Sequence, residues 1–328
     1  MKLLKKIHYV GAVSVLGASL WAAGPAARAA EWPARPVTVI VPWAAGGGTD
    51  ATARILASLL EKNLGQPFPV VNRAGGGGVA GHTEIAHARP DGYTIGVITT
   101  ELSMYTHQGL TSLSYKDFTP IAQYNSDAPG LLVRADSSYK TAKDLLAAIG
   151  ANPGKMKAAG ANQGGLLHLA MVGMLQSAGL DPLSVLWVPT QGGAKGLAEL
   201  TSGGVDFTTN NLADARALIE AGKVRPLATM ATERDSDYPD VPTLKEATGL
   251  DWTIANWRGV AGPKGLPAGI ADKLSQAVQE ICKSEEFGQF MDKRGYTVAC
   301  LSRNDFATAL EEREKQFGMA MKAGGLAK

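Results

Sequence analysis

Aromatic residues and cysteines are scarce in this chain, and several catalytic signatures are missing. Phe, Trp and Tyr make up 6% of the 328 residues, and two residues are cysteines. The sequence holds no G-x-S-x-G motif, no C-x-x-C pair and no paired catalytic-carboxylate pattern. Nucleophilic, thiol-redox and glycosidase mechanisms therefore have no candidate residues, and the sequence predicts a protein that is not an enzyme.

Basic residues form no stripe beyond the N-terminal segment, which argues against nucleic acid as a partner. Three lysines lie within the first six residues, an apolar run of small residues follows at 7–23, and Ala27-Arg28-Ala29 suits cleavage after Ala29. We therefore predict a cleavable signal peptide at 1–29. A retained membrane anchor fits less well, because the apolar run is short and is broken by Gly and Ser.

The small positive charge of the chain belongs to the precursor. Removing the predicted signal peptide takes away four of the 32 basic residues and leaves 28 against 30 acidic ones. The remaining composition, with 45% hydrophobic and 19% charged residues in the whole chain, suits a soluble protein of one large or two moderate domains. We expect the mature protein to be exported and free in the periplasm.

Glycine is abundant, with 39 residues, and it gathers where predicted strands end. Residues 37–41 (V-T-V-I-V) form an apolar β-branched strand, and the small-residue loop 44–48 follows it. A helix is predicted at 51–63, with Thr49 or Asp50 as its cap. A strand, a glycine loop and a helix N-terminus in series favour an anion, because free N–H groups and the helix dipole meet there.

The next residues repeat this pattern. Predicted strands at 67–72 and 93–100 flank a second glycine loop, 75–78, and a helix at 79–88. Such a β-α-β-α-β order indicates a parallel sheet. Ligands of such sheets bind beyond the carboxyl ends of the strands, where both glycine loops and Glu101 are expected.

The middle third follows the same logic. Strands end in loops of small or amide-bearing residues at 160–165, 189–193 and Asn210-Asn211. Two α/β units with such loops indicate two lobes that face one another. The last third has no further glycine loop and is predicted to be scaffolding.

A dinucleotide site is the main alternative. Gly76-x-Gly78-x-x-Gly81, with Glu101 twenty residues later, matches the spacing of the dinucleotide-binding fingerprint. Its context fits poorly, because the preceding strand is short and flanked by proline, and because a free NAD pool is not expected outside the cytoplasm. The first loop also lacks the lysine of a P-loop, which argues against a nucleoside triphosphate.

The histidines do not indicate a metal site. His82 and His87 flank Glu84 at a spacing of five, so the two rings diverge around a helix and the zinc-protease pattern fails. We predict them to be surface histidines. A helix is predicted at 166–178, and His168 in its first turn is predicted to brace loop 160–165.

Several side chains keep two interpretations. Asp50 either caps a helix and ties the loop or acts as a catalytic carboxylate, and Lys195 either reaches a ligand anion or is solvated. Glu101 either faces the solvent or points inward, where it would repel a second carboxylate and favour an amine or hydroxyl. Cys282 and Cys300 either pair, which contributes roughly 3 kcal/mol, or remain two buried thiols.

Seven ordered motifs resemble one known family, the Bug or TctC solute-binding proteins of tripartite tricarboxylate transporters. They are R-P-V-T-V-I-V-P-W-A-A-G-G-G-T-D (35–50), V-V-N-R-A-G-G-G-G (70–78), A-R-P-D-G-Y-T (88–94), V-P-T-Q-G-G (188–193), L-T-S-G-G-V-D (200–206), I-E-A-G-K-V-R-P-L-A (219–228) and Y-P-D-V-P-T-L-K-E-A (238–247). The likeness runs from about residue 32 to the C-terminus.

The resemblance implies a two-domain periplasmic binding protein of the type II-like α/β class, closing like a Venus flytrap. Each domain would be a mainly parallel sheet flanked by helices, with the ligand in the cleft between them. Domain 1 would combine 30–129 with 255–328, and domain 2 would be 130–254. The hinge would lie near 126–132 and 250–258.

The resemblance, together with the loops, gives a set of candidate ligand-binding residues. In the first domain they are Trp43, Ala44, Ala45, Gly46, Gly47, Thr49, Asp50, Gly77, Gly78, Val79, Thr100 and Glu101. In the second they are Ala161, Asn162, Gln163, Gly164, Thr190, Gln191, Gly192, Asn210 and Asn211. Backbone amides and bridging waters would hold the ligand's carboxylate.

Three departures from the family pattern leave the identity of the carboxylate open. The common P-F-P-P-G-G loop is Pro42-Trp43-Ala44-Ala45-Gly46-Gly47 here, without a stiffening proline. The common V-P-Y-K-G is 188–192 (V-P-T-Q-G), without its aromatic ring and cation. The usual Gly-Thr after the third strand is Thr99-Thr100, followed by Glu101.

The sequence thus predicts an extracytoplasmic receptor that captures a small organic carboxylate. It would act as a monomer without cofactor or metal and deliver its ligand to the membrane permease subunits of a tripartite transporter. An exported dinucleotide-binding enzyme and a receptor that serves signalling are the alternatives.

Overall fold

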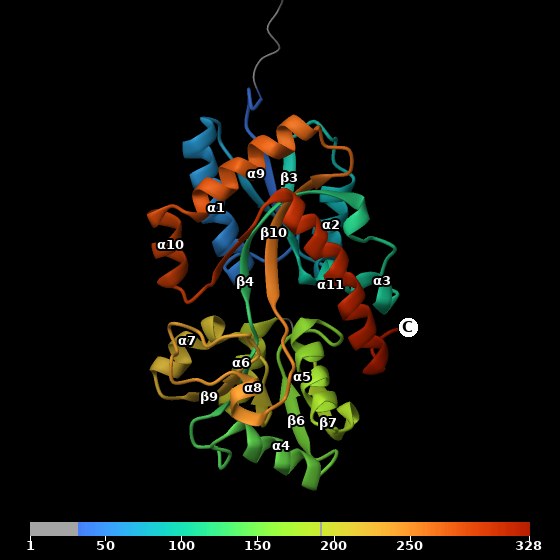
Figure 1. The fold of residues 1–328 in the computed structure, drawn as a ribbon, viewed down its shortest axis with the longest axis vertical. Helices are drawn as coiled ribbons and strands as arrows, with labels where there is room; N and C mark the ends of the chain where they lie inside the picture. Colours follow the sequence, from blue (N-terminus) through green and yellow to red (C-terminus); the bar gives the residue numbers. More distant parts are fainter. Residues whose placement is uncertain (1–31, 191) are drawn as a thin grey trace, which may run out of the picture. The chain divides into compact units, whose positions relative to one another are not determined.

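The computed structural model describes residues 32–328 except Gln191. The predicted signal peptide, 1–29, lies outside the described residues. Trp32–Lys328 form one compact unit that contains a six-stranded and a five-stranded sheet (Figure 1). Within the described residues, we find no helix with the length and apolar character needed to cross a membrane.

The six-stranded sheet has the order β11-β4-β10-β3-β1-β2. Its strands are β1 (Thr38–Val41), β2 (Val70–Asn72), β3 (Thr94–Thr99), β4 (Phe118–Asp127), β10 (Asn256–Pro263) and β11 (Val298–Leu301). β1 pairs in parallel with β2 and β3, whereas β10 runs antiparallel to β3 and β4, and β11 antiparallel to β4. The central position of β10 means that a segment late in the sequence completes a sheet begun by the first strands.

Apolar side chains on both faces of the first sheet recruit helices. Val39, Val97 and Val260 are almost fully buried in one cluster, and Ile40 and Ile98 belong to another. Burial on both faces explains why these strands read as continuous hydrophobic runs. The helices that follow or cover these strands are α1 (Gly48–Leu64), α2 (Val79–Ala86), α3 (Tyr105–Gln108), α9 (Ala268–Cys282), α10 (Glu285–Asp292) and α11 (Arg303–Ala323).

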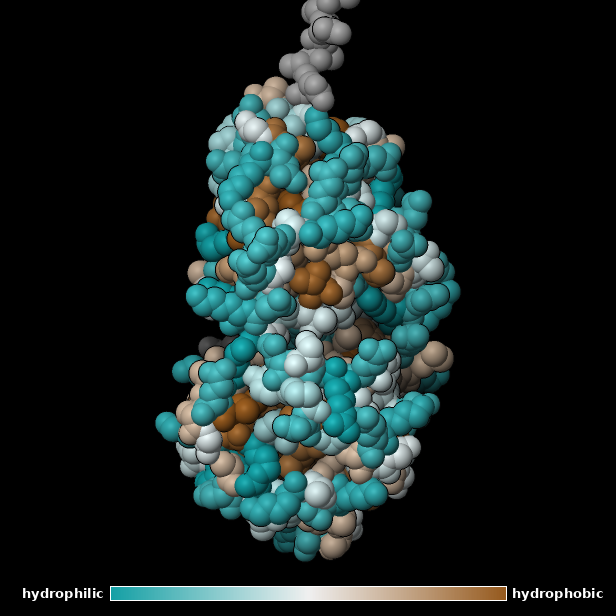
Figure 2. Space-filling view, turned by 60° about the vertical axis from the view of Figure 1, so that its left-hand side comes forward, coloured by the Kyte–Doolittle hydropathy of each residue, from teal (hydrophilic) through white to brown (hydrophobic). Residues whose placement is uncertain are grey.

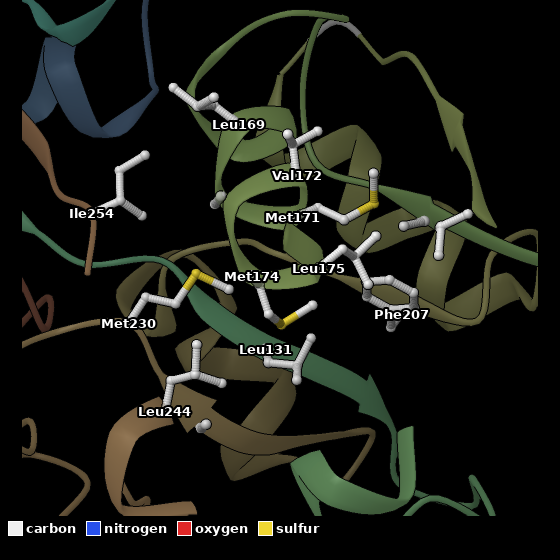
Figure 3. Close-up of a cluster of buried hydrophobic side chains, with 14 of the residues drawn as sticks. Leu131, Leu169, Met171, Val172, Met174, Leu175, Phe207, Met230, Leu244 and Ile254 are labelled. Atoms are coloured by element: carbon white, nitrogen blue, oxygen red, sulfur yellow. The ribbon is translucent and has the colours of Figure 1, made fainter. Parts of the chain in front are cut away.

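The five-stranded sheet has the order β7-β6-β8-β5-β9. Its elements are β5 (Gly130–Arg134), β6 (Met156–Ala159), β7 (Val185–Val188), β8 (Phe207–Thr208) and β9 (Val224–Thr229), with α4 (Ala142–Ala151), α5 (Leu166–Ser177), α6 (Gly193–Ser202), α7 (Leu212–Glu220) and α8 (Leu244–Thr248). Its core forms around α5, ten of whose twelve residues are buried. Figure 3 shows Met174 of this helix beside Leu131, and Leu175 beside Phe207.

Both sheets are mixed, so the expectation of mainly parallel sheets is wrong. In the second sheet, β6 pairs in parallel with β7 and β8, but β5 runs antiparallel to β8 and β9. The antiparallel strands β4, β5 and β10 adjoin the two segments that cross from one sheet to the other. The chain leaves the first sheet at the end of β4 and returns to it as β10, which runs antiparallel to β4.

α11 contacts elements of both sheets along its length. Its first residues carry Phe306 and Leu310, which lie in a cluster with Trp257 of β10. Phe317 and Met321, further along, join the cluster of the second sheet that contains α5. The C-terminal helix is therefore scaffolding, as expected, but it braces both sheets.

Polar residues dominate the face shown in Figure 2, where apolar residues form small separate patches. The large hydrophobic side chains that are exposed in the described chain are Leu110, Leu183, Leu186 and Met319. Scattered exposed apolar residues of this kind are ordinary for a soluble protein.

Cys282 and Cys300 form a disulfide, with their Cα atoms 6.4 Å apart. The bond joins the last residue of α9 to the edge strand β11. Of the two interpretations left open by the sequence, the structure has the paired one.

Candidate ligand-binding site

The first glycine loop is exposed and leads directly into a helix. Residues 44–47 are exposed, and α1 begins at Gly48, with Gly47 as its N-cap and no side-chain cap. The prediction that Thr49 or Asp50 caps this helix is therefore wrong, because the helix begins at Gly48, three residues before its predicted start. Within the described chain, the N–H groups of Gly47, Gly48 and Thr49 donate to no acceptor.

Asp50 ties this loop down. Its Oδ2 accepts from the Gly46 N–H at 2.9 Å, and its Oδ1 accepts from Asn72 Nδ2 at 2.9 Å. Arg54 pairs with it at 2.9 Å. Burial acts to raise the pKa of Asp50, but hydrogen bonds from Arg54, Gly46 and Asn72 outweigh this and hold the pKa below its ordinary value. The carboxylate is fully engaged and shapes the loop.

Arg258 supports the first glycine loop through Thr49, and it was not among the residues predicted from the sequence. This β10 residue is 4% exposed and pairs with Asp127 across 2.6 Å. Its Nη1 also donates to Asn125 Oδ1, and its Nε donates to Thr49 Oγ1 at 3.0 Å. An arginine within an otherwise apolar, extended segment is the sequence feature that could have indicated a buried, paired charge at this position.

The second glycine loop has a backbone that requires glycine. The φ angles of Gly76, Gly77 and Gly78 are +59°, +66° and +96°, values that other residues rarely adopt. A Cβ at Gly78 would lie 2.7 Å from Tyr105 Oη and 3.3 Å from a Trp43 ring carbon. The loop thus packs closely against the first loop, and Val79 begins α2 behind it.

His82 is buried, which corrects its assignment as a surface histidine; His87 is exposed. The Nε2 atom of His82 accepts from the Thr99 N–H at 3.1 Å, so the Nδ1 atom of His82 carries the proton and lies 2.9 Å from Gly78 O. Burial lowers the pKa of His82 to about 4, so the ring stays neutral. His82 therefore locks the second glycine loop to the end of β3.

Thr100 and Glu101 follow β3, and their side chains form hydrogen bonds with different parts of the first sheet. Thr100 is buried, and its hydroxyl accepts from the Trp257 N–H at 2.8 Å, which fixes β10. Glu101 is half-buried, and its Oε2 accepts from Thr99 Oγ1 at 2.7 Å. Burial raises the pKa of Glu101. Of the two orientations open from the sequence, the structure has the inward one.

Loop 160–165 is braced as expected. The Gly164 N–H donates to His168 Nδ1 at 2.9 Å, and the His168 ring stacks on Trp187 at 4.5 Å between centroids. Burial lowers the pKa of His168 to about 4. Gln108 Nε2 of the first sheet's α3 donates to Gly164 O, so this loop is held to both halves of the unit.

Loops from the two sheets approach each other here. A Cβ at Gly77 would lie 3.8 Å from Asn162 Nδ2. The next residue, Gln163, is exposed. Ala161 O accepts from the Thr190 N–H at 3.0 Å. The single hydroxyl hydrogen of Thr190 can be donated either to Gly160 O in loop 160–165, at 3.1 Å, or to Gly192 O in its own loop, at 3.0 Å. Gln191 lies outside the described residues.

Asn210 and Asn211 follow β8 and are 0% and 1% exposed. In the described chain, both polar atoms of the Asn210 side chain and the Oδ1 of Asn211 have no partner. Buried polar groups almost always have a partner, because an unpaired one costs about 1–3 kcal/mol. A Cβ at Gly193 would lie 2.5 Å from Asn210 Nδ2. These amides are therefore suited to a ligand or water beside the α6 N-terminus.

Two other features lie apart from these loops. A cavity of about 660 Å³ adjoins the crossing segments and α11, with Ser126, Ile254, Arg313 and Phe317 among its lining residues. It contains none of the predicted ligand-binding residues. Lys195 is exposed. Among residues 32–328 without Gln191, no group of three His, Cys, Asp or Glu side chains is arranged to hold a metal ion.

The fold places the chain in the class of two-lobed periplasmic binding proteins. Residues 52–326 match the family described as the tripartite tricarboxylate transporter family receptor, TctC, and the chain belongs to this family. The resemblance seen in the sequence motifs is confirmed. Such family members are solute-binding receptors.

Three similar proteins illustrate the relationship. A UPF0065 protein from the tcbD-tcbE intergenic region of Pseudomonas sp. strain P51 is 32% identical over 277 residues, which cover 84% of this chain and 82% of that protein. A Rhodopseudomonas palustris protein solved with adipate has a TM-score of 0.81 and 27% identity, covering 90% and 99%. MatC of the same species, solved with malate, has a TM-score of 0.75 and 29% identity, covering 88% and 99%.

Proposed function

We propose that this chain is a periplasmic receptor that captures a small organic carboxylate and delivers it to the permease subunits of a tripartite transporter. The observation that carries the proposal is the set of free N–H groups at Gly47, Gly48 and Thr49. They lie at the N-terminus of a 17-residue helix, where the helix dipole favours an anion. The related proteins that hold malate and adipate support the same ligand class.

The second sheet supplies the opposing half of the site. Asn162 approaches Gly77 of the second glycine loop, and the unpartnered amides of Asn210 and Asn211 lie beside α6. We propose that 32–129 with 255–328 and 130–254 act as two domains that close by bending near 126–132 and 250–258. Bridging waters complete the contacts to the carboxylate.

The remaining parts of the proposal follow from the same site. The acids of the first loop and of β4 are engaged in ion pairs, through Asp50 and Asp127, and they hold structure instead of reacting. The receptor acts as a monomer, without catalysis and without a cofactor, after removal of the signal peptide.

Thermal unfolding in the presence of candidate ligands tests this function. The purified mature protein is heated with mono-, di- and tricarboxylates, aromatic acids, amino acids and NAD. A ligand present at a hundred times its Kd stabilises the folded state by about 2.7 kcal/mol, which raises Tm. A rise with NAD and with no carboxylate would overturn the proposal in favour of a dinucleotide-binding protein.

Gly47→Val is expected to weaken carboxylate binding at least tenfold while leaving Tm of the unliganded protein nearly unchanged. The φ angle of −83° at Gly47 suits valine, and a Cβ there meets only Ala44 O, at 3.8 Å. The new side chain would instead occupy the space in front of the free N–H groups. Gly269→Val in α9, where a Cβ also has open space, is the matched control. Unaltered affinity in Gly47→Val, measured by calorimetric titration, would remove the first loop from the site.

A further inference from the structure

A short chain of hydrogen bonds holds Glu101 in place. Trp43 Nε1 lies 3.3 Å from Thr99 Oγ1, and Thr99 Oγ1 lies 2.7 Å from Glu101 Oε2. An indole N–H can only donate, so the Thr99 oxygen accepts from it and directs its single hydrogen toward Glu101. The chain therefore fixes Glu101 Oε2 as an acceptor in one orientation.

This acceptor lies between the two glycine loops. Trp43 begins the first loop, and the N–H of Thr99 donates to His82, which locks the second loop. Tyr105 donates to Gly77 O at 2.9 Å. Burial, together with the nearby charge of Glu101, raises the pKa of the Tyr105 hydroxyl. Glu101 is thus close to the groups that shape both loops.

Glu101 has no cationic partner within the described chain, unlike Asp50 beside the first loop and Asp127 at the end of β4. Asp50 pairs with Arg54, and Asp127 pairs with Arg258. The charge of Arg258 acts on Glu101 from a distance and lowers its pKa, against the larger effect of burial. The hydrogen bonds that Arg258 donates go to other residues. The site therefore keeps one oriented, uncompensated carboxylate.

A second acid, Asp214, adds negative charge from the other sheet. It lies in the first turn of α7, where its Oδ2 is 3.5 Å from Asn211 Nδ2, and it makes no ion pair in the described chain. Although the residue as a whole is exposed, desolvation of its carboxylate raises the pKa to about 6, while the charge of Arg258 acts to lower the pKa and that of Asp127 to raise it. Both sides of the site thus contain an acid.

We infer that Glu101 is a specificity-determining residue that selects carboxylates which also carry an ammonium group. The carboxylate of such a ligand binds the free N–H groups of α1, and its ammonium group donates to Glu101. This inference rests on the proposed function and narrows its ligand class. A ligand whose second group is another carboxylate would meet like charge at Glu101, which disfavours it.

Three acids with one carbon skeleton test the inference. Succinate, malate and aspartate carry hydrogen, hydroxyl and ammonium at the same carbon, and a parallel set is glutarate, 2-hydroxyglutarate and glutamate. Calorimetric titration at pH 8 and constant ionic strength is expected to give at least tenfold tighter binding of the amino acid than of the plain diacid. Glu101→Gln should reduce this ratio at least tenfold, because the amide has no charge to offer the ammonium group.

The matched control is Glu61→Gln, which removes the same charge from an exposed position on α1 and should leave the ratio unchanged. Equal or tighter binding of the plain diacid by the unaltered protein would overturn the inference and leave the proposed function intact. An affinity ratio of amino acid to plain diacid that is unchanged in Glu101→Gln would also overturn the inference and leave the proposed function intact. Binding of no carboxylate at all would overturn the proposed function, and this inference with it.

The pH dependence provides a second measurement. The groups that face Glu101 are the Thr99 hydroxyl, Tyr105 and Arg258, which keep their charge as pH falls from 8, whereas Asp214 on the other side of the site titrates with a pKa of about 6. As pH falls through the raised pKa of Glu101, its carboxylate takes up a proton and loses its attraction for ammonium. The preference for the amino acid should therefore shrink as pH falls, and it should shrink less in Glu101→Gln, where Asp214 still titrates; an equal decline in both proteins contradicts the role.

Discussion

Replacing Arg258 with alanine is expected to lower the free energy of unfolding by about 3–5 kcal/mol, because it leaves the buried carboxylate of Asp127 without its cationic partner. Both side chains are 4% exposed and their atoms are 2.6 Å apart. The same change removes the hydrogen bond to Thr49 Oγ1, so the first glycine loop should also lose its support. Urea-induced unfolding followed by circular dichroism measures the change in stability.

Arg234→Ala is the matched control for this prediction. Arg234 pairs with Glu246 at 2.9 Å, but the two side chains are 45% and 47% exposed, and such surface pairs contribute about 0–1 kcal/mol. Replacing Arg258 and Asp127 together should cost less than the sum of the two single changes. A loss at Arg258 no larger than that at Arg234 would show that the buried pair is not needed for stability.

Removing the disulfide is expected to cost roughly 3 kcal/mol. It joins residues 18 positions apart, and the edge strand β11 is otherwise weakly attached. Its pairing with β4 is limited to Val298 with Asn125 and Leu301 with Gln123, with an irregular register between them. The variant Cys282→Ala with Cys300→Ala should therefore unfold at a lower temperature in calorimetry.

Reducing agent separates the disulfide from the effect of altered side chains. It should lower Tm of the unaltered protein toward that of the double alanine variant and should leave the variant itself unchanged. Hydrogen exchange should rise first at the amides of β11 (Val298–Leu301). A reductant-insensitive Tm in the unaltered protein, with the bond verified as open, would contradict the prediction.

Local sequence patterns predicted much of the fold correctly because the relevant forces act over short distances. The strand at 37–41, the glycine loop and the following helix correspond to β1, residues 42–47 and α1. The helix predicted at 166–178 corresponds to α5 (Leu166–Ser177). These segments combine β-branched runs, glycines and apolar spacing, which act through the neighbouring backbone.

Long-range pairing explains the errors. The last third was predicted only to be scaffolding, whereas residues 256–263 form β10, the strand between β3 and β4. Nothing in a strand's own residues fixes which neighbour it chooses or in which direction. The expectation of mainly parallel sheets failed for this reason, and α10 (Glu285–Asp292) was not predicted because it is one short amphipathic helix.

The support of the candidate site was harder to predict than its loops. Glycine and amide residues after strands are visible in the sequence. The burial of His82 depends on contacts with Tyr105, 23 residues away, and the placement of Arg258 depends on Asp127, 131 residues away. Whether a polar side chain is a solvated surface group or a buried brace is decided by such distant partners.

The position of β10 also determines the order in which the two halves can fold. Residues 130–229 supply every strand of the five-stranded sheet from one continuous stretch, whereas the six-stranded sheet lacks its β3–β4 connection until residues 256–263 are available. Closing a chain segment of this length before any pairing is gained makes such a sheet slow to form. We therefore expect the first glycine loop, although it comes earliest in the chain, to receive its support from Arg258 late in folding.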